Sequence, residues 1–177
     1  MVRHIGLAAA LAALTAAGGP ARAAIFSDNF DGEAQKLSAT VLANFAVANA
    51  GPGGNVDVIG GNPNSFFDFL PGNGNYLDLD GTAEIIPSTA AVLRSDAGLL
   101  ALGAGDYVLT FSLAGSQRGD VNTVDVGVGT AGNATAFASQ QYIVQSADGF
   151  STRTVGFTLA APADVRLTFT NAGTDNF

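Results

Sequence analysis

Apolar and polar residues alternate with a period of two along most of the chain after its first two dozen residues. The clearest alternation covers 107–113, and similar runs lie at 124–128, 141–145, 154–159 and 165–169. Side chains two positions apart in a strand share a face, so this alternation predicts strands with one buried and one solvated face. Shorter strands are expected at 41–47, 56–59, 76–80 and 90–94.

The connections between these runs predict how the strands are assembled. Gly, Asn and Pro separate eight or nine short strands, which is typical of an antiparallel sandwich or barrel. We therefore expect an all-β fold, an antiparallel two-sheet sandwich of jelly-roll-like form. The segment 160–164 predicts a hairpin between the last two strands, and 33–37 allows at most one turn of helix. The Gly/Asn-rich stretches 49–55, 60–65 and 71–75 are interpreted as surface loops of a single domain.

The first 23 residues have the pattern of a secretory signal. Arg3 precedes an apolar run at 5–17, a Gly-Gly-Pro break follows, and Ala-Arg-Ala at 21–23 supplies a small-x-small cleavage pattern. The run is shorter than the ~20 apolar residues that a membrane-spanning helix needs. We expect residues 1–23 to be removed before Ala24, leaving 24–177 as the β-sandwich domain; the alternative is a buried N-terminal helix.

Composition then excludes several classes of function. Removal of 1–23 takes away the only His, so the remaining chain has no His, Cys or Trp. It keeps five basic and fifteen acidic residues, which give a net charge of −10. Without His or Cys there is neither a catalytic triad nor an ordinary zinc site, and oxygen donors favour calcium. Sparse Lys and Arg exclude a nucleic-acid partner. Paired carboxylates of a glycan hydrolase or lyase remain the enzyme alternative.

Three stretches carry a family resemblance: NVDVIGG at 55–61, PGNGNYLDLDG at 71–81, and 105–129 around LAGSQRGD. They resemble exported bacterial proteins that end in a PEP-CTERM sorting tail, whose sandwich is similar to carbohydrate-binding jelly rolls and to DUF642-type cell-wall proteins. The resemblance implies a non-catalytic extracellular or envelope protein connected with exopolysaccharide.

The chain departs from this family pattern in two places. Phe45 stands in a segment where members often carry Trp, and the sequence stops at TNAGTDNF, where members continue with a last strand and the tail. We therefore expect 24–177 to lack its last strand. An unpaired sheet edge would favour self-association.

Arg118, Asp120 and Asn122 follow the strongest predicted strand and form the first candidate site. A guanidinium donates in a planar fork while carboxylate and amide oxygens accept, which suits the hydroxyl groups of a sugar. The alternative is a charged turn in which Arg118 pairs with an acid and fixes the loop.

Tyr76, Asp78 and Asp80 are expected on one face of a strand, where an aromatic ring and two acids could bind sugar or calcium. The alternative is a solvent-facing row of carboxylates that keeps the sheet soluble.

Asp28, Asp31 and Glu33 bring hard oxygen ligands together near the mature N-terminus. The family resemblance implies a structural calcium ion near both chain ends, so these three acids are the predicted metal ligands.

These observations predict a secreted, non-catalytic module that binds polysaccharide or cell-surface matrix, without a membrane span. The alternative from the structural class is a surface or biofilm matrix protein with no specific ligand.

Overall fold

The chain forms an all-β sandwich in a computed structural model that describes residues 8–16, 24–48, 55–61, 67–81, 92–95 and 100–172. No helix occurs among these residues, so none is long and apolar enough to cross a membrane. The strands are β1 (Ala8–Ala16), β2 (Phe26–Asp28), β3 (Lys36–Ala39), β4 (Phe45–Ala48), β5 (Val56–Gly60), β6 (Asn75–Asp78), β7 (Val92–Ser95), β8 (Leu100–Leu102), β9 (Gly105–Ala114), β10 (Val121–Gly129), β11 (Ala138–Gln145), β12 (Ser151–Leu159) and β13 (Ala163–Asn171).

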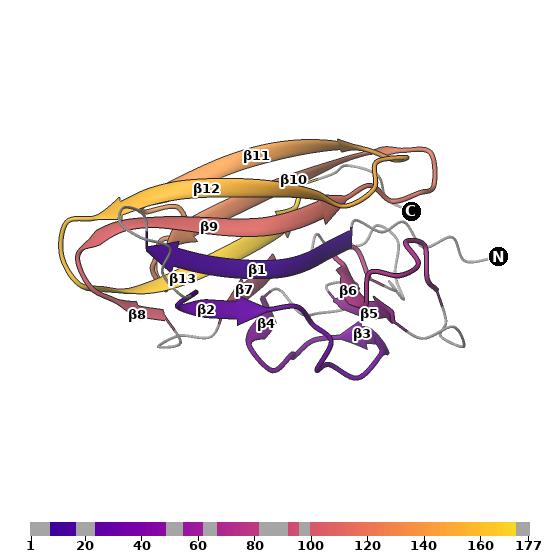
Figure 1. The fold of residues 1–177 in the computed structure, drawn as a ribbon, viewed down its shortest axis with the longest axis horizontal. Coiled ribbons are helices and arrows are strands. Elements are labelled where there is room, and N and C mark those ends of the chain that lie inside the picture. Colours follow the sequence, from indigo (N-terminus) through magenta and orange to yellow (C-terminus); the bar gives the residue numbers. More distant parts are fainter. Residues whose placement is uncertain are drawn as a thin grey trace.

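The strands form two antiparallel sheets packed face to face (Figure 1). The seven-stranded sheet has the order β12-β9-β1-β6-β5-β3, with β2 paired to β1. The six-stranded sheet has the order β11-β10-β13-β7-β4, with β8 paired to β13. β9 and β12 pair in the first sheet, while β10 and β11, which lie between them in sequence, pair in the second. The chain therefore crosses from the first sheet to the second after β9 and returns to the first before β12, which gives the predicted jelly-roll-like sandwich.

One local prediction was wrong. The segment 160–164 does not close a hairpin, because β12 pairs with β9 in one sheet and β13 pairs with β10 in the other. The turn there carries the chain across the sandwich, which lets both strands bury their apolar faces in the same core. The segment 33–37, which allowed at most one turn of helix, contains none and leads into β3.

The core between the sheets is built by the inward residues of the alternating strands. In β9 the side chains at 107, 109, 111 and 113 are buried, and those at 108, 110 and 112 are partly exposed. Aromatic rings meet edge to face where strands from both sheets approach. Phe45 lies 5.9 Å from Phe26 and 6.4 Å from Phe169, and Phe169 lies 5.3 Å from Phe111, between ring centroids. Phe45, which stands where the resembling family often has Trp, is fully buried.

The predicted signal segment contributes a strand to this structure. Residues Ala8–Ala16 form β1, which lies between β9 and β6 in the first sheet (Figure 1). Leu14 is fully buried in the core. The structure describes the chain before any processing, so removal of residues 1–23 remains a prediction.

Replacing Phe45 with Ala tests the aromatic centre of the core. Deletion of a fully buried ring costs about 3–5 kcal/mol, because both transfer free energy and packing are lost. We expect F45A to lower the free energy of unfolding by this amount in urea titrations. The matched control is Val41→Ala on the neighbouring segment, whose side chain is 73% exposed; it should change stability by less than about 0.5 kcal/mol. Equal effects of the two variants would contradict this account of the core.

Candidate functional site

Tyr76, Asp78 and Asp80 are buried, so the alternative of a solvent-facing row of carboxylates is wrong. Their exposed fractions are 0%, 2% and 7%. The neighbouring Leu77 and Leu79 are fully buried as well, which means that both faces of β6 are covered. Alternation of apolar and polar residues did not distinguish β6 from a strand with one solvated face, because polar side chains occupy alternate positions in both cases.

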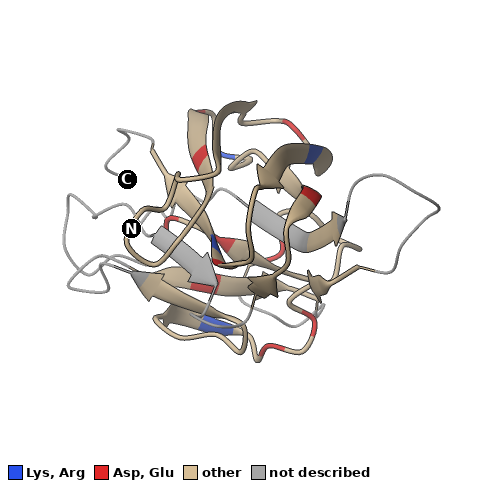
Figure 2. Cartoon of the chain, turned by 90° about the vertical axis from the view of Figure 1, so that its left-hand side faces the viewer, with Lys and Arg blue, Asp and Glu red and all other residues tan. Residues whose placement is uncertain are grey.

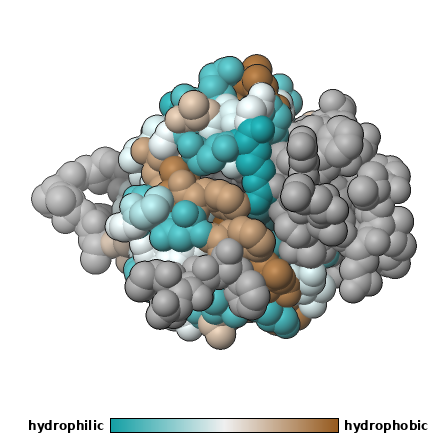
Figure 3. Space-filling model, turned by 90° about the vertical axis from the view of Figure 1, so that its right-hand side faces the viewer, coloured by the Kyte–Doolittle hydropathy of each residue, from teal (hydrophilic) through white to brown (hydrophobic). Residues whose placement is uncertain are grey.

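The segment after residue 66 covers the Tyr76 side of β6. The Tyr76 hydroxyl accepts hydrogen bonds from the backbone N–H groups of Phe69 (2.8 Å) and Leu70 (3.1 Å) and donates to Asp68 Oδ1 (3.1 Å). Its ring packs edge to face on Phe150, with the centroids 5.5 Å apart. Burial raises the pKa of Tyr76 to about 12. Figure 3 views this end of the molecule, where an apolar band crosses the surface.

Three buried carboxyl groups lie together at the same place. Asp57 and Asp78 are cross-strand partners on β5 and β6, and Asp78 Oδ1 accepts the backbone N–H of Asp80 at 3.0 Å. Asp57 Oδ1 accepts the N–H of Ser38 at 2.7 Å. Burial is the main cause that raises the pKa of Asp78 to about 8; the charges of Asp57 and Asp80 also raise it, while the hydrogen bond from the Asp80 N–H and the charge of Arg118 lower it. Asp78 is therefore largely protonated at neutral pH.

Arg118 brings the two predicted ligand-binding clusters into one network. Its guanidinium lies 4.4 Å from the ring centroid of Phe69, above the segment that covers Tyr76. Burial lowers the pKa of Arg118, while nearby carboxylates, first Asp78 and then Asp120, oppose that effect. The loop thus supplies a cation that partly compensates the buried acids, in addition to a cation–π contact.

The remaining polar groups of this loop are directed at one another. Asp120 accepts hydrogen bonds from Ser116 Oγ and from Asn122 Nδ2 (2.7 Å), and Asn122 Oδ1 accepts the Ser116 N–H at 3.1 Å. Asn122 is 1% exposed. These contacts stabilise the turn between β9 and β10. A ligand-binding role for the six residues stays a prediction; in the structure Tyr76, Asp78, Asp80 and Asn122 are buried, and Arg118 and Asp120 are partly exposed.

The three predicted metal ligands bind separate parts of the backbone and loops. Asp28 accepts the Phe30 N–H (2.8 Å) and Asn44 Nδ2 (3.0 Å). Asp31 Oδ1 accepts the N–H of Asn75 at 2.9 Å, and Glu33 Oε1 accepts that of Ala43 at 2.6 Å. Within the described ranges, no group of three or more acidic side chains converges as a metal site would require. The calcium site therefore stays a prediction.

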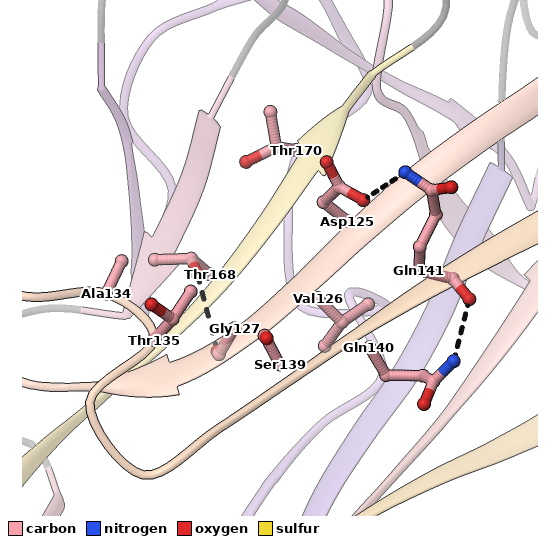
Figure 4. A pocket seen from close by; sticks show the side chains of 10 residues that line it. All are labelled: Asp125, Val126, Gly127, Ala134, Thr135, Ser139, Gln140, Gln141, Thr168 and Thr170. Carbon is pink, nitrogen blue, oxygen red and sulfur yellow. Dashed lines mark hydrogen bonds between the residues drawn. The ribbon is translucent and has the colours of Figure 1, made fainter.

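A polar hollow of about 410 Å³ lies on the outer face of the six-stranded sheet (Figure 4). Two rows of cross-strand partners form its floor and sides. Gln141, Asp125 and Thr170 stand opposite one another on β11, β10 and β13, and so do Ser139, Gly127 and Thr168. Asp125, Ser139 and Gln141 are exposed. The hollow is lined by Asp125, Val126, Gly127, Ala134, Thr135, Ser139, Gln140, Gln141, Thr168 and Thr170.

Gly127 allows the loop between β10 and β11 to close against the strand at one side of this hollow. A Cβ atom at this position would lie 2.5 Å from Thr168 Oγ1 and 2.7 Å from the Ala134 carbonyl oxygen. The loop between β10 and β11 therefore approaches the strand more closely than any larger residue would allow. Thr168 Oγ1 donates to the Gly127 carbonyl at 3.3 Å, and the Phe137 N–H donates to Val128 O at 3.0 Å, closing the loop.

The side chains around the hollow supply hydrogen-bond donors and acceptors. Gln141 Nε2 donates to Asp125 Oδ1 at 2.8 Å, and Gln140 Nε2 donates to the Gln141 carbonyl at 3.0 Å (Figure 4). Among the described residues that line the hollow, Asp125 is the one carboxylate and none is aromatic. Figure 2 shows the charged residues dispersed over the chain, with the few basic ones apart from one another. The hollow can bind an uncharged polyhydroxyl group edge-on through hydrogen bonds, without ring stacking.

No motif in the sequence marks the residues that line the hollow. The alternation places 123, 125, 127 and 129 of β10 on the outer face, and the two glycines among them are the available signal. Glycine inside a strand marks a close approach of other atoms. The sequence does not show which polar residues of β11 and β13 stand beside that glycine, because this depends on the strand register.

Asp78→Asn is expected to flatten the pH dependence of stability. The pKa of Asp78 is about 8 in the folded chain and 3.8 in the reference state, so the folded state holds the extra proton between these values. The stability that this proton supplies is complete below about pH 4 and is lost as pH rises through 8, by at most ~1.4 kcal/mol per pH unit. Urea titrations at pH 5, 6.5 and 8 should show a smaller loss for D78N than for the natural chain. Asp164→Asn, at an exposed position, is the control, and parallel profiles for D78N and the natural chain would contradict this assignment.

Calcium should raise the melting temperature if Asp28, Asp31 and Glu33 help to hold an ion. A ligand that binds only the folded state stabilises it by about 2.7 kcal/mol at one hundred times its Kd. The measurement compares melting in excess EDTA, in millimolar magnesium and in millimolar calcium. An increase specific to calcium is expected, and identical melting temperatures would reject the site.

Comparison with protein-family models, curated proteins and solved structures gave no match to this chain. Its function is therefore argued from the site.

Proposed function

We propose that this chain is a secreted, non-catalytic β-sandwich module that binds polysaccharide of an extracellular matrix or cell surface. The observation that carries the proposal is the hollow beside Asp125 and Gln141, most of whose lining residues are polar. Its amide, hydroxyl and carboxylate groups offer a sugar edge several hydrogen bonds at once. The apolar run and cleavage pattern in residues 1–23 support export.

The charge of the chain narrows the class of glycan. The full sequence carries a net charge of −8, and Asp125 borders the hollow. Like charges repel, so uronate-rich or sulfated polysaccharides would bind poorly at low ionic strength. Neutral glycans are the favoured ligands, with donors to Asp125 supplied by their hydroxyl groups.

The surroundings of the carboxylates favour binding over hydrolysis. Glycoside hydrolysis uses two carboxyl groups about 5–10 Å apart on either side of the scissile bond. Asp125 has no second carboxylate beside it among the residues that line the hollow. The acids Asp57, Asp78 and Asp80 lie close together but are buried.

Substitution of Gln141 and of Asp125 tests the glycan site. Each replacement by Ala removes hydrogen bonds to the ligand, and the loss of a charge-assisted bond is worth about 1.5–3 kcal/mol. We expect affinity for a responsive neutral polysaccharide, found by affinity electrophoresis over a panel of neutral and acidic ones, to fall at least tenfold for D125A and measurably for Q141A.

The matched control is Gln145→Ala, an exposed glutamine on the same strand that does not line the hollow. It should bind like the natural chain. If no polysaccharide of the panel is retained, or if the three variants bind alike, the glycan proposal fails in favour of a matrix protein without a specific ligand.

A further inference from the structure

β1 is held in the first sheet along both of its edges. On one side it pairs with β9, from Ala8 opposite Ala114 to Ala16 opposite Tyr107, with one bulge between Ala10 and Ala12. On the other side it pairs with β6 at residues 8–9 and with β2 at 12–14. The strand therefore completes the hydrogen bonding of three neighbours.

β1 also supplies a side chain to the core. Leu14 is fully buried opposite Leu109 of β9 and Phe26 of β2. These three residues belong to the same apolar cluster between the sheets. Loss of the strand would remove both its backbone hydrogen bonds and a buried aliphatic side chain.

The same residues carry the export pattern. Cleavage before Ala24 separates β1 from the domain that it completes. β9 and β6 are each antiparallel to β1 and hence parallel to each other, about two strand spacings or roughly 9–10 Å apart. They cannot pair across this distance, so the processed sheet contains a slot that is one strand wide.

We propose that the processed chain is a strand acceptor, in which the slot left by β1, between β9 on one side and β6 and β2 on the other, binds an extended segment of a different protein. This inference rests on the secretion part of the proposed function and is independent of the glycan hollow. Addition of a strand to an open sheet edge is a known mode of recognition, in which backbone hydrogen bonds give affinity and side-chain positions give specificity.

β1 itself defines the chemistry of the incoming segment. It is uncharged over its nine residues and consists of small residues and two leucines. A partner strand should therefore be uncharged, run antiparallel to β9, and place a large aliphatic side chain where Leu14 packs. A second copy of the processed chain is disfavoured, because each copy has a net charge of −10.

The experiment replaces the natural strand with a synthetic one. A protease site is introduced between residues 16 and 24 of the full chain, so that the protein folds with β1 present and is then cut. The probe is a fluorescent peptide of the sequence 8–16 with two added lysines for solubility. After the cut segment with β1 is separated from 24–177 in urea and the urea is removed in the presence of the peptide, we expect saturable binding of the peptide and slower hydrogen exchange of 107–114 in its presence.

Peptide variants test the register and the core contact. Replacement of Leu14 by Asp in the peptide should weaken binding at least tenfold, whereas Thr15→Ser, at a partly buried position, should change it little. The chain 24–177 is also refolded directly. If it does not fold alone, the natural peptide and not L14D should restore its β-sheet circular dichroism.

Several results would overturn the proposal. The first is equal binding of the natural and L14D peptides. The second is a cut chain that remains a stable monomer and takes up no peptide. The third is a dimer of 24–177 that the peptide does not dissociate. Mass spectrometry of the exported protein tests the premise separately, because a species that retains residues 1–23 outside the cytoplasm would remove the slot without bearing on the glycan site.

Discussion

The fold depends on the pairing of β9 along both of its edges. β12 lies on one side over the whole strand and β1 on the other, while residues 107, 109, 111 and 113 fill the space between the sheets. An unpaired backbone N–H or C=O group in such a position loses water without gaining a partner, which costs free energy. β9 therefore constrains everything beside it, including the turn that carries Arg118 and the buried acids of β5 and β6.

Much of this architecture could be predicted from the alternation of residues. The runs at 107–113, 124–128, 141–145 and 165–169 all lie inside observed strands, and Tyr107, the first residue of the first run, is buried in the core and stacked on Phe157. The pairing partners could not be predicted in the same way. A short turn at 160–164 can close a hairpin or cross between sheets, and the choice depends on which long-range pairing of β12 and β13 buries more apolar surface.

The candidate site was less accessible to sequence analysis than the fold. Polar residues that are close in sequence, such as those at 116–122, could be recognised as a cluster from the sequence. In the structure their polar groups form hydrogen bonds with one another. The hollow combines Asp125, Gly127, Gln141 and Thr168 from three strands, and no short motif connects them. Polar residues on an outer sheet face are common, so only the register and the close loop over Gly127 make these particular ones into a hollow.

The two sheets keep the hollow and the strand slot physically separate. The hollow is formed by β10, β11 and β13 on the outside of the six-stranded sheet, whereas the slot lies within the seven-stranded sheet on the other side of the core. The contact of Phe111 with Tyr142, with ring centroids 5.4 Å apart, is one of the few that join β9 to β11 across this core. A strand added beside β9 would therefore lie within one sheet without contacting the side chains around the hollow on the other. The two proposed binding events would not compete, because the aromatic and aliphatic core holds the two surfaces apart.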